Sequence, residues 1–215
     1  MTVHLALYDT FADYEYGHVA AHLPGGVTTV GPTREPVTSK AGLRITPDLA
    51  LAELRPEDSA MLILPGADLW FGDALAPFAR TARAFLAAGV PVAAICGATY
   101  GLAAEGLLDD RDHTSAAPEY LAMSGYGGAA RYRDADAVTD GDLITAGPTA
   151  PIAFAREVFA RLGTFPPEVL DAWYRLFRDA DPEAYAVFAA AQEAPHGGEE
   201  PAAQPPEAAE RAARA

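Results

Sequence analysis

The chain contains only one cysteine, and it has half as many basic as acidic side chains. A single cysteine excludes an internal disulfide framework and a cysteine-rich zinc site. The 15 Lys and Arg residues stand against 30 Asp and Glu residues, giving a net charge of -15. Binding to nucleic-acid phosphates needs a basic stripe, so this balance argues against a nucleic-acid partner. No uncharged apolar run reaches about 18 residues, so we expect no membrane-spanning helix.

The amino-terminal residues carry no basic leader and no cleavage site, so we expect no signal peptide. A free thiol is typical of a reducing compartment, and the predicted location is therefore cytoplasmic. Half of the residues are hydrophobic, which is enough for a globular core. His18 and His22 are spaced for one helix face, but without a third ligand they predict surface residues rather than a metal site. We expect no metal and no cofactor.

Short apolar runs alternate with helical patterns along the chain. Strands are expected at residues 3–8, 27–30, 60–64, 90–95, 129–133 and 143–145, with a hairpin at 36–45. Helices are expected at 14–23, 73–88, 98–108, 151–162, 167–178 and 182–192, with helical turns at 47–54 and 118–123. This alternation predicts an α/β fold with a mostly parallel sheet between helices. Ligands then bind beyond the carboxyl ends of the strands.

The same patterns predict three parts of the chain. Residues 1–163 form the α/β domain, and residues 164–192 form a C-terminal helical extension packed on it. Residues 193–215 are rich in Ala, Pro and Glu and have almost no large apolar side chains. Such a segment cannot bury enough apolar surface to offset its ordering entropy, so we expect a disordered tail.

Cys96 stands where a buried strand passes directly into a helix of small residues. A nucleophile at such a turn, next to Gly97, is typical of an elbow that lifts the side chain out of the sheet. Amide groups and the peptide dipoles at a helix N-terminus favour the thiolate, so we expect a pKa of Cys96 below about 8.5. The alternative interpretation is a buried, inert cysteine.

Several segments resemble the ThiJ/PfpI superfamily, which is class I glutamine amidotransferase-like and includes the parkinsonism-associated deglycase relatives. They are Glu15 with its neighbours, Leu62–Gly66, Ala93–Thr99, Ala104–Asp109 and Asp140–Gly147, in the right order across about residues 3 to 163. The resemblance implies a flavodoxin-like three-layer sandwich with a cysteine nucleophile elbow, usually as a homodimer. It also implies amidase or peptidase, isocyanide hydration, glyoxalase or deglycase, or stress-response roles.

The resemblance further implies that Glu15 hydrogen-bonds the thiol of Cys96. A carboxyl facing a thiolate in a dry pocket tends to keep its proton, which it can donate. Gly66 lets the backbone approach a ligand, and the N–H groups of Ala67 and Gly97 are a candidate oxyanion hole.

Family hydrolases place a histidine base after the strand that follows the elbow helix. The matching position here is Ser115, which cannot act as a base near neutral pH and is kept as a candidate substrate-binding residue. His113 lies two residues earlier and would share its face on a strand, so His113 is the candidate base. The alternative is that His113 caps the sheet without reaching the pocket.

Two functions remain open. The first is a cysteine-dependent hydrolase, amidase or glyoxalase/deglycase-type enzyme whose partner is a small electrophilic substrate, either an amide or a reactive carbonyl. The second is a non-catalytic redox sensor or stress chaperone that acts through oxidation of Cys96.

Overall fold

The computed structural model describes residues 2–193. The predicted tail at 193–215 lies, apart from Glu193, outside the described residues. None of the described helices is both long and apolar enough to cross a bilayer.

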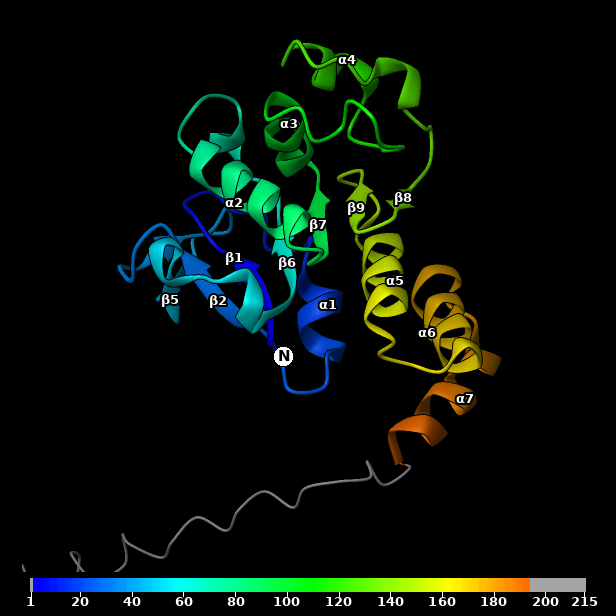
Figure 1. Ribbon diagram of the computed structural model, residues 1–215. Coiled ribbons are helices and arrows are strands. Elements are labelled where there is room, and N and C mark those ends of the chain that lie inside the picture. Colours follow the sequence, from blue (N-terminus) through cyan, green and yellow to red (C-terminus); the bar gives the residue numbers. More distant parts are fainter. Residues whose placement is uncertain (1, 194–215) are drawn as a thin grey trace, which may run out of the picture.

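A sheet of seven strands in the order β5-β2-β1-β6-β7-β9-β8 forms the centre of the molecule (Figure 1). Its strands are β1 (Thr2–Ala6), β2 (Thr28–Gly31), β5 (Leu49–Ala50), β6 (Ser59–Leu64), β7 (Val92–Ile95), β8 (Ala137–Asp140) and β9 (Leu143–Ala146). Only β8 pairs antiparallel with its neighbour, whereas the other pairs are parallel. The predicted α/β fold with a mostly parallel sheet is confirmed.

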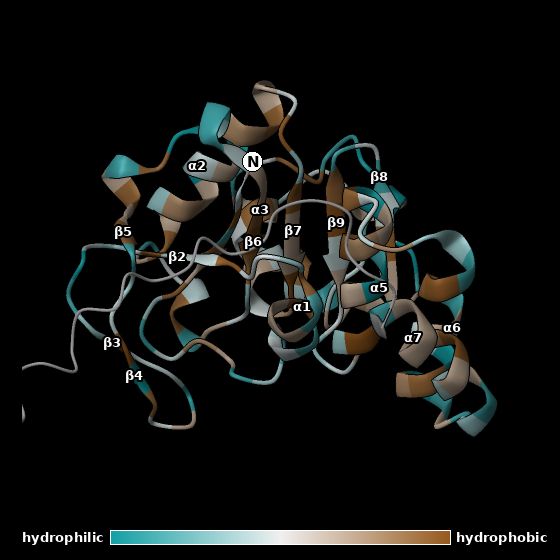
Figure 2. Ribbon diagram, turned by 90° about the horizontal axis from the view of Figure 1, so that it is seen from below, coloured by the Kyte–Doolittle hydropathy of each residue, from teal (hydrophilic) through white to brown (hydrophobic). Residues whose placement is uncertain are grey.

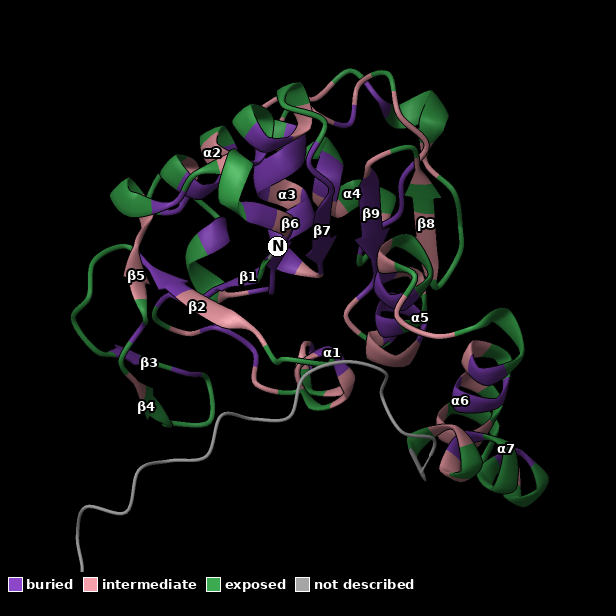
Figure 3. Cartoon of the chain, turned by 60° about the horizontal axis from the view of Figure 1, so that its bottom comes forward, coloured by how far each residue is buried: buried purple, intermediate pink, exposed green. Residues whose placement is uncertain are grey.

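Helices cover both faces of the sheet, α2 and α3 on one and α1 and α5 on the other (Figure 2). The helices are α1 (Gly17–His22), α2 (Ala76–Ala87), α3 (Gly97–Ala104), α4 (Pro118–Ala122), α5 (Pro151–Leu162), α6 (Pro167–Asp179) and α7 (Pro182–Glu193). With both faces covered, Leu62, Ile63 and Leu64 of β6 are all fully buried. Figure 3 shows β6 and β7 coloured mostly as buried. This burial on both faces is why the two strands read as continuous apolar runs rather than as alternating ones.

Three expectations about individual elements were wrong. The strand expected at 129–133 is a 3-10 helix, Ala129–Arg131, whose residues are exposed, and the sheet is extended instead by β8. The segment at 47–54 begins as β5 and becomes a 3-10 helix, η1, only at Leu51–Glu53. The first helix begins at Gly17 rather than at residue 14, because residues 11–16 form turns that direct Glu15 into the interior.

Helices α6 and α7 pack against α1 and α5 through aromatic side chains. The ring of Trp173 lies 5.0 Å from that of Phe159, and the ring of Phe177 lies 5.0 Å from that of His22. His18 and His22 are half-buried in this cluster rather than lying free on the surface. The prediction of surface residues was therefore wrong, because α6 covers the histidine face of α1.

Candidate active site around Cys96

Cys96 forms a sharp turn between β7 and α3. Its backbone has φ 57° and ψ −124°, which is an unfavourable conformation for a residue with a side chain. Within residues 2–193 the non-glycine residues with positive φ are Thr10, Cys96 and Ala180. Thr10 and Cys96 line one cavity of about 400 Å³. Strained backbone of this kind collects at functional sites, where the surrounding structure holds it in place.

The cavity lies beyond the carboxyl ends of three neighbouring parallel strands. Glu15 comes from the loop after β1, Gly66 follows β6, and Cys96 follows β7. Within the sheet, β2 lies on one side of β1, whereas β6 and β7 lie on its other side. The cavity is therefore at the point where the strand order reverses, which is the usual ligand position in such sheets.

Glu15 is fully buried at the floor of this cavity. Its Oε2 atom accepts a hydrogen bond from the N–H of Gly66 at 2.5 Å. Its Oε1 atom is buried and has no hydrogen-bond partner within the described residues. Burial raises the pKa of Glu15, although the Gly66 amide and the nearby thiol act in the opposite direction. The carboxyl is thus biased toward its protonated form, in which it is a hydrogen-bond donor.

The thiol of Cys96 is partly buried, and its surroundings disfavour the thiolate while Glu15 is ionised. Burial and then the negative charge of Glu15 raise the pKa of Cys96 from 9.0 to about 12. The amide of Gly97 lowers the pKa, as expected at a helix N-terminus, but its effect is smaller. The prediction of a pKa below the ordinary value was therefore wrong for this state. When Glu15 holds a proton the repulsion is removed, so the two groups behave as a pair that shares one proton.

Gly66 is the residue that lets these two side chains meet. A Cβ atom at this position would lie 2.8 Å from Cβ and 3.0 Å from Sγ of Cys96, and 2.9 Å from Oε2 of Glu15. Gly97 is similarly close to the loop after β6, because its Cβ would lie 3.0 Å from the carbonyl oxygen of Ala67. Ala67 and Gly97 both line the cavity beside the thiol. Their role as an oxyanion hole stays a prediction.

The structure does not bring His113 into the cavity. His113 is fully buried, and its Nδ1 atom lies 2.8 Å from the carbonyl oxygen of Arg111. Its Nε2 atom lies 3.1 Å from the hydroxyl of Tyr126. The segment forms a single bridge to Tyr132 rather than a regular strand, so the alternation on which the prediction rested does not hold. Burial also lowers the pKa of His113, which keeps the ring neutral.

Ser115 supports the elbow from behind rather than lining the cavity. The hydroxyl of Thr99 donates to the carbonyl oxygen of Cys96 at 2.6 Å. The Ser115 Oγ atom lies 2.6 Å from the same Thr99 oxygen, so Ser115 is the donor in that pair. The next residue, Ala116, lines the cavity. Ser115 therefore braces the turn that holds Cys96.

The cavity also has walls that are not among the predicted site residues. Tyr14, Lys40, Asp68, Phe71 and Tyr120 all line it. Lys40 Nζ donates to Asp68 Oδ1 at 2.8 Å. Lys40 is the only lysine of the chain, which is a signal available in the sequence, but nothing near residue 40 connects it to Cys96.

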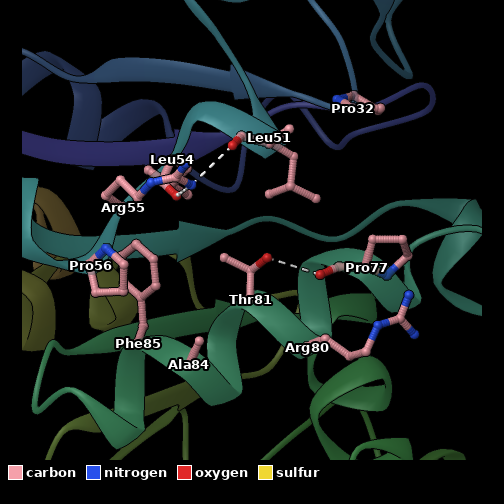
Figure 4. A pocket seen from close by; sticks show the side chains of 11 residues that line it. Pro32, Leu51, Leu54, Arg55, Pro56, Pro77, Arg80, Thr81, Ala84 and Phe85 are labelled. Carbon is pink, nitrogen blue, oxygen red and sulfur yellow. Dashed lines mark hydrogen bonds between the residues drawn. The ribbon is translucent and has the colours of Figure 1, made fainter.

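A larger cavity of about 620 Å³ lies between η1 and α2 (Figure 4). Its walls are Pro32, Leu51, Ala52, Leu54, Arg55, Pro56, Pro77, Arg80, Thr81, Ala84 and Phe85. These residues include no cysteine, histidine or carboxylate, so we place the chemistry in the smaller cavity. Within residues 2–193, no three His, Cys, Asp or Glu side chains are grouped as metal ligands.

Comparisons of the sequence and of the structure with known proteins match this chain to one protein family. A sequence profile described as the DJ-1/PfpI family matches residues 1–161. The Bacillus subtilis (strain 168) protein named Uncharacterized protease YoaZ is 38% identical over 196 residues, covering 85% of this chain and 93% of that protein. The solved thiJ/pfpI family protein from Bacillus anthracis is 37% identical, with a TM-score of 0.84 over 88% of this chain and 95% of the other. DJ-1 superfamily protein Atu0886 from Agrobacterium tumefaciens is 35% identical, with a TM-score of 0.75 over 84% and 99%.

Proposed function

Since the chain belongs to the DJ-1/PfpI family, we propose that it is a cysteine-dependent enzyme that acts on a small reactive carbonyl compound. The nucleophile is Cys96 Sγ, and Glu15 exchanges a proton with it. The observation that carries the proposal is the closeness of these two groups at Gly66. Oε2 of Glu15 and Sγ of Cys96 both lie within 3.0 Å of the position that a Cβ atom at Gly66 would occupy. A buried carboxyl and a thiol that share one proton can attack and then protonate without a further base.

The proposed step is addition of the thiol to the carbonyl carbon. As the S–C bond forms, the thiol proton passes to the Glu15 carboxylate and the π electrons of the C=O bond move to oxygen. In this proposal the amides of Ala67 and Gly97, which both line the cavity, stabilise that oxyanion. Glu15 then returns its proton to the oxygen, giving a thiohemiacetal with no net loss of atoms or charge. Where a second carbonyl lies beside the first, as in methylglyoxal, the hydrogen of the thiohemiacetal carbon moves as a proton through an enediol to the neighbouring carbon. Water then cleaves the resulting thioester to a hydroxy acid and the free thiol.

We favour a reactive carbonyl over an amide because of the leaving group. Amide cleavage requires expulsion of an amine, which must be protonated as it leaves. The described residues that line the cavity include no histidine. His113 lies outside the cavity, where its ring nitrogens are hydrogen-bonded to the carbonyl oxygen of Arg111 and the hydroxyl of Tyr126. The names of the Bacillus subtilis relatives contain the word protease. Attack on a peptide carbonyl would begin with the same thiol addition, so the two reactions differ only in the steps that follow.

The test compares an aldehyde with an amide. Purified protein is incubated with methylglyoxal, or with a peptide anilide, and the loss of each compound is followed. We expect turnover of the aldehyde that disappears in Cys96→Ser and falls strongly in Glu15→Gln, with the exposed-carboxylate variant Glu35→Gln as the matched control. Aldehyde turnover that survives Cys96→Ser overturns the proposal. Cys96-dependent cleavage of the anilide alone would move the assignment to amide chemistry.

A second candidate function is oxidant sensing through Cys96. The observation that favours it is the buried Oε1 atom of Glu15, which has no hydrogen-bond partner among residues 2–193 and in the protonated carboxyl can donate to an oxygen on sulfur. Each of two peroxide molecules would transfer one oxygen to Sγ and leave as water, giving a sulfinate. Mass spectrometry after peroxide treatment tests this. Stable sulfinate in the wild type, lost in Glu15→Leu and accompanied by no aldehyde turnover, would favour the sensor.

A further inference from the structure

The hairpin of β3 (Val37–Thr38) and β4 (Arg44–Ile45) carries Lys40 at its turn. Three backbone N–H groups of this hairpin donate to the loop after β1, all at 2.8 Å: Thr38 to Asp9 Oδ1, Lys40 to the carbonyl oxygen of Phe11, and Ala41 to Asp13 Oδ2. These bonds attach the turn to the loop that also supplies Glu15. The backbone of Lys40 is therefore held in a defined place at the edge of the cavity.

The ammonium group of Lys40 has bonding capacity beyond its ion pair. It donates to Asp68 at 2.8 Å, and the two side chains are 58% and 65% exposed. An ammonium has three N–H donors, and Asp68 occupies one of them. The charge also acts on the thiol, because Lys40 lowers the pKa of Cys96. Lys40 is the one basic residue among those that line the cavity.

Other groups around the thiol are donors as well. The hydroxyls of Tyr14 and Tyr120 belong to the cavity wall, and burial raises the pKa of both, to about 12 for Tyr120. Both phenols therefore keep their protons near neutral pH. A ligand that complements this wall carries acceptors, and a negative charge is best placed beside Lys40.

We propose that Lys40 selects substrates with an anionic group, so that the substrate class is a small electrophile with a carboxylate or similar anion beside its reactive carbon. The inference rests on the proposed function, because it assumes that the substrate reaches Cys96. Asp68 holds Lys40 while the cavity is free and competes with the anion for it. In a chain with a net charge of -15, one placed cation is what allows an anion to approach the thiol.

Two alkylating probes of the same reaction test this directly. Iodoacetate is anionic and iodoacetamide is neutral, and with each the thiolate forms an S–C bond while the C–I bond breaks and iodide leaves. Both rates depend on the same thiolate, so their ratio cancels any change in the pKa of Cys96. Cys96 is the only cysteine, so the mass increase of the intact protein reports this one site. Rates are measured at low ionic strength, where exposed charges are least screened.

We expect Lys40→Met to lower the ratio of iodoacetate to iodoacetamide rates about fivefold, the size typical of a good exposed charge contact. Lys40→Arg should keep most of the ratio. Asp68→Asn should raise it, since it removes both a competitor for Lys40 and a repelling charge. Arg44→Met is the matched control, because it removes one positive charge from the same hairpin at an exposed residue outside the cavity wall. Its ratio should equal that of the wild type.

The outcomes separate the two proposals. If neither probe labels Cys96 at any accessible pH, the proposed nucleophile fails, and the inference fails with it. If both probes label Cys96 and neither Lys40→Met nor Asp68→Asn changes the ratio, the inference is overturned while the proposed function stands. Asp68→Asn leaves Lys40 in place, so its increase is measurable even if Lys40→Met folds poorly.

Discussion

Replacing Glu15 with glutamine isolates the effect of one buried charge on the thiol of Cys96. Glutamine has nearly the same shape as glutamate, and its side-chain oxygen can still accept the hydrogen bond that Gly66 donates at 2.5 Å. What disappears is the titrating proton and the negative charge. In the wild type, Glu15 and Cys96 together lose two protons in two steps. The pKa of the second step describes the two coupled groups rather than the thiol alone. In Glu15→Gln only the thiol titrates.

The size of the effect follows from the causes that raise the thiol pKa. The pKa of Cys96 rises from 9.0 to about 12, and burial is the largest cause. Burial remains in the variant, whereas the charge of Glu15, the second cause, is removed. We therefore expect the upper pKa to fall by about 1, which is equal to about 1.4 kcal/mol in favour of the thiolate. Aldehyde turnover should nevertheless fall, because the group that returns the proton is gone.

The assay is the rate of iodoacetamide labelling as a function of pH. The wild type should show a shoulder where one proton has left the pair, followed by a rise toward the upper pKa. Glu15→Gln should show a single rise at lower pH than the upper step of the wild type. Glu35→Gln, which removes an exposed charge, should reproduce the wild-type profile. If Glu15→Gln keeps the upper pKa of the wild type, the carboxyl does not act on the thiol and the reasoning is refuted.

The same variant should change the dependence of stability on pH. The pKa of Glu15 is raised above its ordinary 4.5 by burial, so above pH 4.5 the folded state holds a proton that the unfolded state has lost. Stability therefore falls as pH rises from 4.5 toward the folded pKa, and each unit of pH in that window costs about 1.4 kcal/mol. Glu15→Gln removes this loss, so urea unfolding should find the variant more stable than the wild type at pH 7. The two proteins should converge below pH 4.5.

Three further substitutions test the supporting structure. Gly66→Ala places a methyl group 2.8 Å from Cβ of Cys96. The rate of labelling by iodoacetamide should therefore change at least threefold while the circular dichroism spectrum stays native. An unchanged rate contradicts the tight contact. His113→Ala removes the two hydrogen bonds of a buried ring, so urea unfolding should show a free energy of unfolding lower by about 2 kcal/mol. Aldehyde turnover per folded molecule should be retained. Lost turnover in folded protein would return His113 to the mechanism. Gly101→Ala drives a Cβ atom into the Trp70 ring, which should cost about 3 kcal/mol in stability, and a neutral result would mean that the indole moves freely.

The sheet and the elbow could be predicted because their signals are local. Residues 60–64 and 90–95 read as strands since parallel strands buried on both faces need apolar side chains at successive positions. The helix expected at 151–162 has those bounds in the structure, where Pro151 occupies the first turn and Gly163 ends the helix with φ 63°. Cys96 followed by Gly97 marked the turn, because few residue pairs suit it.

The surroundings of the thiol could not be predicted from local pattern. The prediction for the pKa of Cys96 considered only the helix N-terminus, and that effect is present through the Gly97 amide. Burial and Glu15 outweigh it, and both depend on segments about 80 residues apart in the chain, which fold together only through the parallel pairing of β1, β6 and β7. Lys40 is a similar case, since only the hydrogen bonds of its hairpin place it beside the thiol.

His113 shows why the alternation of side chains along a strand did not predict the candidate base. Residues two apart share a face only where the backbone is a regular strand, and the segment at residue 113 makes one bridge and then turns away. Resemblance located the segment correctly beside the elbow, as the bond between Ser115 and Thr99 shows. It did not determine which side chain would face the cavity, because that depends on the backbone of a short irregular connection.

The candidate site concentrates features that lower stability, and this argues that the fold retains them for chemistry. Thr10 and Cys96 hold positive φ, and Glu15 buries a carboxyl oxygen without a partner. Each feature costs free energy of about 1 kcal/mol or more. All three meet at one cavity, above strands whose residues are almost fully buried and so cannot shift to relieve the strain. Glu15→Gln, which removes the carboxylate charge that burial disfavours, should therefore gain stability at neutral pH and lose turnover together, and a variant that gains both would show that the site is not maintained for catalysis.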